Sequence, residues 1–414
     1  MEYKILSDGG IESRMNIPMR GSADVIFAGG GVAGCAAALE AARHGCSVIL
    51  FEKSMMLGGL ATLGLVNWFV PMDDGKGRQV IFGMAEEFLR LSIKYGYGNV
   101  NPGWKNGVYE GKSDPPPRYC SGFSADIFAL CLTELLNSAG VELRFDASAV
   151  DILTRKENSA VATEGVIIHD KSGFGFYKSK IVVDVTGDAD LLYKMGVPTL
   201  KRGNYDSYFG KVINMDSIKK ALESGNIGNI YRGVSGGYSN LYGHGHPIDM
   251  PLFDGTDADD ISRYTVSSQI RMLEKLKKDD RLSRDLVQIP GMVNFRATRR
   301  LDGDATLRPE DSGIRYDDSI GAICDFDGRE YLYEVRYGVL VKTGFDGIIT
   351  AGRTASGDGY GWDILRVIPP AIITGQAAGL AAAESIKNGN RIWEPDIRKL
   401  QSILESEDVK IHNR

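Results

Sequence analysis

The first strongly apolar stretches of the chain alternate between strand-like and helix-like patterns. Residues 24–28, Asp-Val-Ile-Phe-Ala, are β-branched and aromatic and predict a short buried strand. Small apolar residues then follow at helical spacing over 35–43, where His44-Gly45 stops the pattern. A second strand is expected over 47–51, and Glu52 ends it. This strand–helix–strand order is typical of α/β proteins with a parallel sheet.

Patterns further along the chain predict a second kind of sheet. Residues 78–95 and 123–139 indicate amphipathic helices, whereas 141–177 alternates apolar and polar positions as strands of a small antiparallel sheet do. Residues 180–184 and 347–350 predict two more buried strands. A helix of small residues is expected from Ala371, directly after Pro369-Pro370. The charged run 271–280 predicts a solvated helix face.

Composition narrows the class of protein. The 414 residues are 43% hydrophobic and 25% charged, as in ordinary soluble globular proteins. The net charge of −6 disfavours nucleic acid as a partner. No two of the five cysteines have CxxC spacing, and no apolar stretch is long enough to span a membrane, so a cytoplasmic protein without a metal is expected. Glycine, at 51 residues, is well above the usual ~7%.

Three of these glycines form a dinucleotide-binding fingerprint. Gly29, Gly31 and Gly34 fill the pattern G-x-G-x-x-G between the first strand and the first helix. The first lets the chain turn, the second lets the backbone approach a pyrophosphate, and the third lets the helix pack on the strand. Glu52, at the end of the second strand, is placed to accept hydrogen bonds from a ribose diol. A simple tight turn is the alternative, but strand, glycines, helix, strand and acid occur here in the required order.

The fingerprint alone does not separate FAD from NAD, and two later features favour FAD. The pair Gly58-Gly59 follows the acid closely, which suits a chain that runs flat against the second half of a long cofactor. The strand at 347–350 leads through Ala351-Gly352-Arg353 to the Pro-Pro helix, whose positive end suits a reduced flavin ring. A nicotinamide-dependent dehydrogenase and a non-catalytic binding protein on a flavin-type fold are the alternatives.

The same motifs resemble a known family. The segments 29–34, 58–62, 184–190 and 351–353 are similar to the hallmarks of FAD-dependent oxidoreductases of the glutathione-reductase-type two-dinucleotide fold, in particular of an uncharacterised group. An arginine-rich segment at 296–303 also resembles a motif of that group. The resemblance spans residues 24–386 and is specific for fold and cofactor, but not for substrate.

The resemblance implies roles for individual residues around FAD. It places the three fingerprint glycines at the pyrophosphate, Glu52 at the adenosine ribose, and the Val150 backbone at the adenine. Relatives in the wider superfamily have Gly-Asp after the late strand, whereas Arg353 follows Gly352 here, so Asp358 is the candidate to replace that acid. The full expected cofactor set is Gly29, Gly31, Gly34, Glu52, Lys53, Gly58, Gly59, Thr62, Val150, Thr186, Gly187, Gly352, Arg353 and Asp358.

Two groups of residues are candidates for the chemistry. His244 and His246 lie in a glycine-rich segment and are candidate bases, although such a loop also occurs simply at a surface. Arg296, Arg299 and Arg300 are candidates for holding a substrate carboxylate, the alternative being an exposed basic turn. Trp68 and Phe69 are candidate walls for the ring, the commoner alternative being packing in the core.

The expected fold is therefore α/β, with a Rossmann-like FAD-binding domain built on a central parallel sheet, a small antiparallel sheet, and an inserted α+β substrate domain. The expected activity is hydride transfer between a small polar substrate, a hydroxy acid or a sugar derivative, and flavin N5. A homo-oligomer is left open. The expected domains are 21–190 (FAD binding, first part), 191–335 (substrate or cap), 336–390 (FAD binding, return segment) and 391–414 (C-terminal helix and tail).

Overall fold

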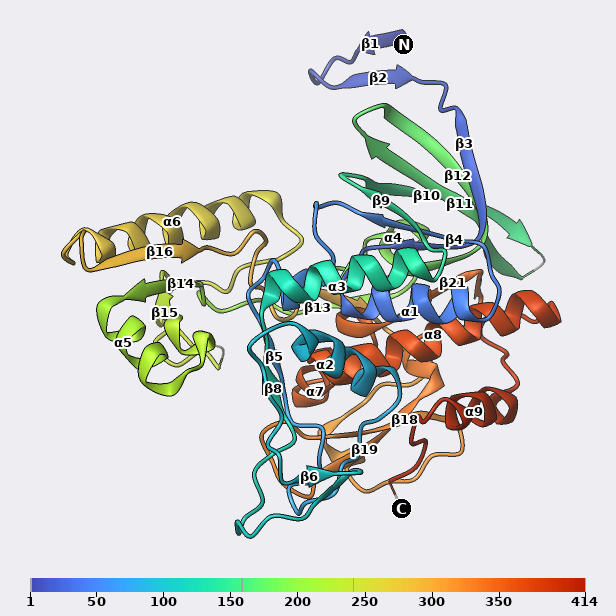
Figure 1. The fold of residues 1–414 in the computed structure, drawn as a ribbon. Coiled ribbons are helices and arrows are strands. Elements are labelled where there is room, and N and C mark those ends of the chain that lie inside the picture. The colour runs from blue at the N-terminus through green and yellow to red at the C-terminus, as the bar shows by residue number, and fades with distance from the viewer. Residues whose placement is uncertain (1, 158, 241, 414) are drawn as a thin grey trace.

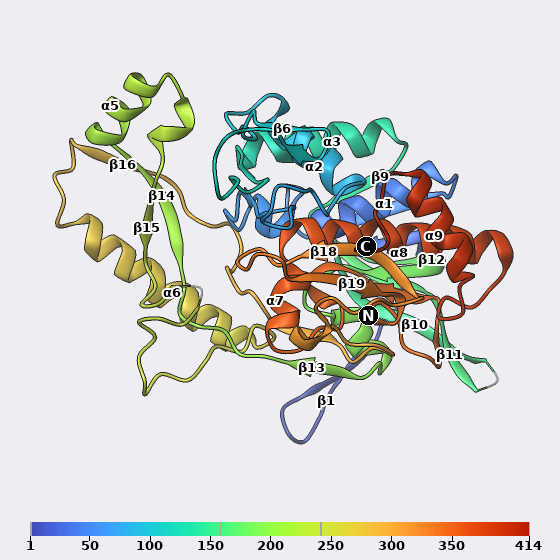
Figure 2. The same cartoon turned by 90° about the horizontal axis from the view of Figure 1, so that it is seen from below.

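The centre of the molecule is one sheet with strand order β10-β11-β12-β3-β4-β9, seen in Figure 1 and from below in Figure 2. The computed structural model describes residues 2–157, 159–240 and 242–413. The strands β12, β3, β4 and β9 pair in parallel, and β20 and β21 attach in parallel to β11 and β12. The bounds are β3 Met19–Ala28, α1 Val32–Arg43, β4 Val48–Glu52, β9 Glu142–Phe145, β10 Ser148–Glu157, β11 Ala160–Asp170, β12 Gly173–Asp184, β20 Phe345–Asp346 and β21 Ile348–Thr350. The predicted α/β fold with a parallel sheet is confirmed.

The predicted antiparallel strands are also present, and they belong to the same sheet. β10 pairs with β11, and β11 with the first half of β12, in antiparallel register. The second half of β12 instead pairs in parallel with β21, while β3 runs along nearly all of it. Because β12 pairs with β11 on one side and with β3 on the other, the antiparallel strands are part of the central sheet and do not form a separate one.

The alternation of side chains along β3 and β4 builds a core on each face of the sheet. Val25, Phe27 and Leu50 pack with α1 and with α8 (Ile368–Asn388) in the larger core. Ile26 and Phe51 face the opposite side and pack with β10, β11 and α4 (Asp190–Met195). Burial on both faces explains why these strands are continuous apolar runs.

Helix α8 is the predicted small-residue helix, with prolines in its first turn. Its glycines face α1: a Cβ at Gly375 or Gly379 would collide with the carbonyl oxygen of Ala33 or Ala37. The glycines of α8 are therefore required for its close approach to α1. Among the described residues no single helix is long and apolar enough to cross a membrane, and α7 (Tyr360–Arg366) and α8 meet that test together only as a pair bent by 73°.

A separate lobe stands beside the main body, at the left of Figure 1. It contains the antiparallel strands β14 (Phe209–Asn214), β15 (Arg232–Ser235) and β16 (Arg284–Gln288) with α5 (Met215–Ser224) and α6 (Ala258–Leu276). Its small core includes Tyr264, Met272 and Phe295. The charged run in α6 is not only a solvated face, because Arg271 donates to the fully buried carboxylate of Asp206 at 2.5 Å.

The remaining elements complete the body. The helix predicted over 78–95 begins only at Met84, because Gly83 has φ +59 and residues before it pair with extended neighbours. Strands β18 and β19 pack with α8 and α9 in the main core, so the lobe occupies only part of 191–335, and the domain limits stay a prediction. The other bounds are β1 Glu2–Ile5, β2 Ile11–Arg14, β5 Trp68–Phe69, α2 Met84–Lys94, β6 Trp104–Lys105, β7 Val108–Tyr109, β8 Ser121–Gly122, α3 Ala125–Ser138, β13 Thr199–Lys201, β17 Arg299–Leu301, β18 Ser319–Cys324, β19 Leu332–Arg336 and α9 Ile397–Ser406.

Candidate functional site

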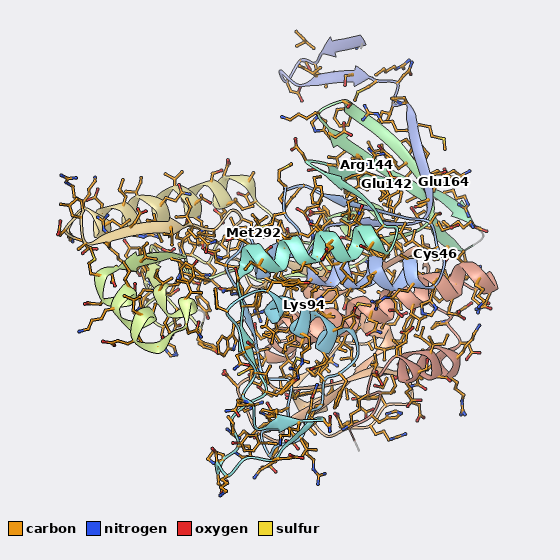
Figure 3. All side chains as sticks on the ribbon, viewed as in Figure 1. Cys46, Lys94, Glu142, Arg144, Glu164 and Met292 are labelled. Carbon is orange, nitrogen blue, oxygen red and sulfur yellow. The ribbon has the colours of Figure 1, made fainter. Side chains whose placement is uncertain are left out.

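A cavity of about 640 Å³ lies at the carboxyl ends of the parallel strands. The residues after β3, β4, β12 and β21 all contribute to its wall, together with the first turns of α1 and α8. Ligands of open α/β sheets bind at this edge. Met292, labelled in Figure 3, lies where the lobe joins the body and lines the cavity.

The three fingerprint glycines have different physical roles. Gly29 has φ +117, and a Cβ there would collide with the Val185 carbonyl oxygen. A Cβ at Gly34 would collide with the Gly29 oxygen, so both glycines are required by the fold. A Cβ at Gly31 would meet no protein atom within 4 Å, yet Gly31 lines the cavity. Protein packing therefore does not require glycine at position 31, but the absence of a side chain there leaves space for a ligand in the cavity.

Glu52 is held in place by the backbone. Its Oε2 accepts a hydrogen bond from the Gly30 N–H at 2.7 Å, and its Oε1 accepts one from the Ser54 N–H at 2.8 Å. The carboxylate is buried and lines the cavity with Lys53. Since each carboxylate oxygen accepts more than one hydrogen bond, both remain suited to a ribose diol.

The glycine pair Gly58-Gly59 lies against the turn formed by the fingerprint glycines. The Gly58 N–H donates to the Gly30 carbonyl oxygen at 2.8 Å, and Gly58 has φ +99. Both Gly58 and Gly59 line the cavity. Thr62 does not line it: its hydroxyl donates to the Leu57 carbonyl oxygen at 2.6 Å and holds the turn closed.

The opposite wall follows β12 and β21. Thr186 and Gly187 line the cavity, and the buried Asp184 holds their turn by accepting from the Thr186 N–H and hydroxyl. Burial raises the pKa of Asp184 to about 6. Residues 147–149 line the cavity on the β10 side, whereas Val150 does not.

The late strand brings Gly352 and Arg353 to the cavity but not Asp358. Arg353 donates to the Phe295 carbonyl oxygen at 2.6 Å and to Asp188 at 2.9 Å, so its charge is already paired. The Asp358 side chain is 64% exposed and lies 3.7 Å from Arg300. The structure therefore does not place Asp358 where the missing superfamily acid is expected.

Of the three arginines, only Arg296 lines the cavity. It is buried, and among the described residues its Nη1 has no hydrogen-bond partner. Burial, together with the charges of Arg366 and Arg353, lowers the pKa of Arg296 to about 9. Its backbone N–H and that of Ala297 both donate to the Asn204 side-chain oxygen, at 2.9 and 3.2 Å.

Arg299 and Arg300 instead bind to residues of the main body. Arg299 pairs with Asp190 at 2.7 Å and stacks on Tyr193, and Arg300 donates to the Ser356 hydroxyl at 3.2 Å. Both are buried, so the alternative of an exposed basic turn is wrong.

The cavity as a whole fits an extended dinucleotide. The open position at Gly31, the anchored Glu52 and the second glycine pair form one end, and the other end extends past Val66 and Trp68 to Arg296. The family model for FAD-dependent oxidoreductases matches residues 24–227 and 244–404. The chain belongs to this family. The alternatives of a nicotinamide-dependent dehydrogenase and of a non-catalytic binding protein are therefore set aside. The residues around Gly31, Glu52 and Gly58-Gly59 are those that would hold FAD.

The first of the following solved structures supports the fold. A p-nitrophenol 4-monooxygenase from Pseudomonas putida is 13% identical, with 93% of this chain and 84% of that one covered and a TM-score of 0.50. A geranylgeranyl bacteriochlorophyll reductase-like protein from Thermoplasma acidophilum is 15% identical, with coverage of 94% and 84% and a TM-score of 0.45. A protein described as THI4 from Thermovibrio ammonificans is 21% identical, with coverage of 44% and 66% and a TM-score of 0.32. No curated protein matches the chain. The glutathione-reductase-type subgroup stays a prediction.

The two candidate histidines of the oxidoreductase do not reach the cavity. His244 is exposed, and its backbone N–H donates to the Asn240 side chain at 3.1 Å. His246 accepts the Asp206 N–H at Nδ1, and its Nε2 lies 3.0 Å from the Met250 carbonyl oxygen. With both ring nitrogens bound to backbone, His246 has a structural role here.

Two features of the site were missed by sequence reasoning. Arg366 lines the cavity beside the start of α8 and pairs with Asp363 at 2.6 Å. Its position directly before the Pro-Pro helix start was the available signal. The other feature is a second cavity of about 860 Å³ that shares Val66, Trp68 and Arg296 with the first. It depends on how the lobe meets the body.

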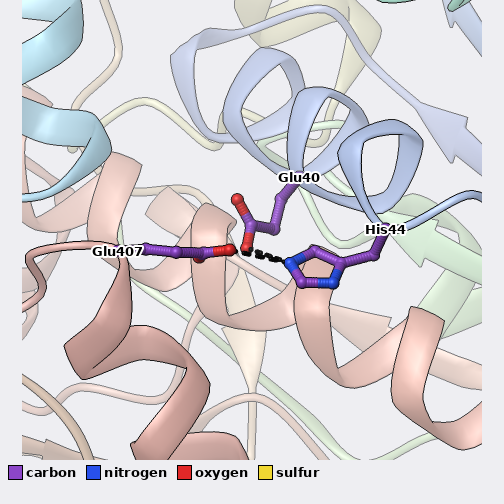
Figure 4. A group of neighbouring side chains, drawn as sticks. All are labelled: Glu40, His44 and Glu407. Atoms are coloured by element: carbon purple, nitrogen blue, oxygen red, sulfur yellow. Dashed lines mark hydrogen bonds and ion pairs between the residues drawn. The ribbon is translucent and has the colours of Figure 1, made fainter.

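One titratable cluster lies away from both cavities, at the end of α1 (Figure 4). His44 Nε2 lies 2.8 Å from Glu407 and 3.3 Å from the buried Glu40. These carboxylates raise the pKa of His44 to about 9, and burial raises the pKa of Glu40 to about 7. The cluster ties the C-terminal segment to α1, about 18 Å along the helix from its cavity end.

Proposed function

We propose that this FAD-dependent oxidoreductase oxidises a small hydroxy acid at the Arg296 end of the first cavity. The observation that carries the proposal is the buried guanidinium of Arg296, which lines the cavity and has an unpartnered Nη1 among the described residues. A buried cation without a partner is costly, and a carboxylate satisfies both its charge and its planar donors.

The charges around this position favour the hydroxy acid over the sugar derivative. Arg353 and Arg366 line the same cavity, and each is already paired with an aspartate, Asp188 and Asp363 respectively. Arg296 therefore offers the charge that remains to be neutralised. A neutral sugar would leave it unpaired.

The chain's own residues would orient the substrate. The carboxylate binds to Arg296, which fixes the adjacent carbon relative to the cofactor. When bound, FAD supplies the N5 position that accepts a hydride. Oxidation to the keto acid removes that hydride from carbon and a proton from the hydroxyl, and the proton leaves to bulk water. Val66 and Trp68 line both cavities and lie beside the reacting end of the substrate.

The test is anaerobic reduction of the flavin in the purified holoenzyme. Hydroxy acids are compared with their amides, which keep the reacting carbon and lose the charge. We expect bleaching by an acid and none by its amide. Arg296→Gln should weaken the binding of the acid by about 10- to 100-fold, which is the effect expected from losing one charge-assisted hydrogen bond to a buried group. Arg281→Gln, an exposed arginine of the lobe, is the control. Equal bleaching by acid and amide would refute the proposal.

A further inference from the structure

The second cavity lies between the lobe and the body and adjoins the first. Its wall combines residues of β14 and β15 with residues of β5 and the segment before it. Val66, Trp68 and Arg296 line both cavities, so a molecule bound at Arg296 lies at the border between them.

Six of the residues that line this cavity are aromatic. They are Trp68, Tyr97, Tyr208, Phe209, Tyr231 and Tyr238. Tyr97 and Tyr231 lie with ring centres 5.9 Å apart and tilted by 41°. Trp68 is 51% exposed and Tyr238 52% exposed, which is high for rings of this size. Such rings favour a partner that is itself flat and apolar.

The charge of the wall has one sign. Lys211, Lys275 and Arg296 line the second cavity, and among its described lining residues there is no aspartate or glutamate. Lys211 lies 5.5 Å from the centre of the Tyr231 ring. Burial lowers the pKa of Lys211, and the charge of Asp126 offsets only part of this effect. A concave surface of this kind attracts anions.

We propose that the second cavity binds the aromatic part of an anionic substrate whose carboxylate lies on Arg296. The inference rests on the proposed function and deepens it: the hydroxy acid carries an aromatic side chain. The carboxylate occupies the junction of the cavities, and the ring lies among Trp68, Tyr97 and Tyr231. The reaction remains the one above, with the hydride leaving the carbon that bears the hydroxyl and the proton leaving to water.

Binding is tested in the holoenzyme with compounds that cannot be oxidised. Phenylacetate, acetate and phenylacetamide are titrated while the flavin absorption spectrum is followed. Phenylacetate should bind at least tenfold more tightly than either of the others. Tyr231→Leu should reduce its advantage over acetate severalfold, and Trp68→Leu is the second variant if the first does not fold. Tyr95→Leu, an exposed ring that lines neither cavity, should have no effect.

Turnover is tested separately by anaerobic bleaching with lactate, mandelate and phenyllactate. Preference for the two aromatic acids supports the inference. Equal binding of phenylacetate and acetate, with bleaching by lactate, would overturn the inference and leave the proposed function standing. Tight binding of phenylacetate without bleaching by any hydroxy acid would support the aromatic anion site and overturn the hydroxy acid. Displacement of phenylacetate by NADH or NADPH, with direct reduction of the flavin, would make this cavity a nicotinamide site and overturn the inference.

Discussion

Replacing Gly31 with alanine separates the binding of FAD from the stability of the fold. Gly31 has φ −65 and ψ 173, which alanine adopts without strain, and its added Cβ would meet no protein atom within 4 Å. Loss of glycine's freedom in the unfolded chain should make the apoprotein more stable by about 0.4–1 kcal/mol. The same methyl group projects into the cavity where the pyrophosphate is expected. We therefore expect Kd for FAD to rise at least tenfold, or about 1.4 kcal/mol.

The neighbouring glycines provide the contrast. A methyl group at Gly29 or Gly34 collides with backbone oxygen, so Gly29→Ala and Gly34→Ala should destabilise the apoprotein by about 1–3 kcal/mol or more. Gly233→Ala is the matched control, because this glycine also has open space around it but lies in the lobe.

The assay measures two quantities on each variant. Thermal unfolding of the apoprotein reports stability, and quenching of FAD fluorescence on titration reports Kd. An unchanged Kd in Gly31→Ala would refute the placement of the pyrophosphate. A loss of apoprotein stability in that variant would refute the claim that the position is sterically open.

Two further predictions concern charges away from the cavity. His44→Gln should destabilise the protein by about 1–2 kcal/mol at pH 6.5 and by less at pH 9.5, measured by urea unfolding at both values. The reason is that the pKa of His44 is raised from 6.5 to about 9, so its contribution is complete below pH 6.5 and is lost as the pH rises through 9. Arg271→Met should destabilise by about 3–5 kcal/mol and lower the urea midpoint, because it leaves the Asp206 carboxylate buried without its cation.

Each of these has a matched control of the same chemistry. His169→Gln replaces an exposed histidine of β11, and Lys278→Met replaces an exposed cation just beyond α6. If His44→Gln lowers the free energy of unfolding by the same amount at both pH values, the cluster does not stabilise protonated histidine. If Arg271→Met matches Lys278→Met, the Asp206 pair contributes nothing to stability.

The nucleotide end of the molecule was predictable because its signals are local. Glycine spacing, an acid at a strand end and a proline at a helix start each act within a few residues, and the predicted strand–helix–strand unit and FAD are confirmed. The start of α2 was predicted incorrectly because periodicity continued through residues that a positive φ at Gly83 separates from the helix.

The substrate end was not predictable in the same way. Arg296, Arg299 and Arg300 look alike in sequence, but only tertiary packing decides that the last two have partners within the body. The glycine-rich setting of His246 gave no indication that the Asp206 N–H would bind its ring. The second cavity arises between the lobe and the body, and no local pattern describes it.

The clamp of Asn204 on the backbone of Arg296 and Ala297 joins the outgoing and returning connections of the lobe. The two connections are thereby bound to move as one. A tilt of the lobe would move the Arg296 guanidinium with it, so the shape of the second cavity and the position of the group that binds the carboxylate would change together. A substrate too bulky for the second cavity would push the lobe aside and so displace its own carboxylate from the reacting position, in addition to its steric overlap with the wall.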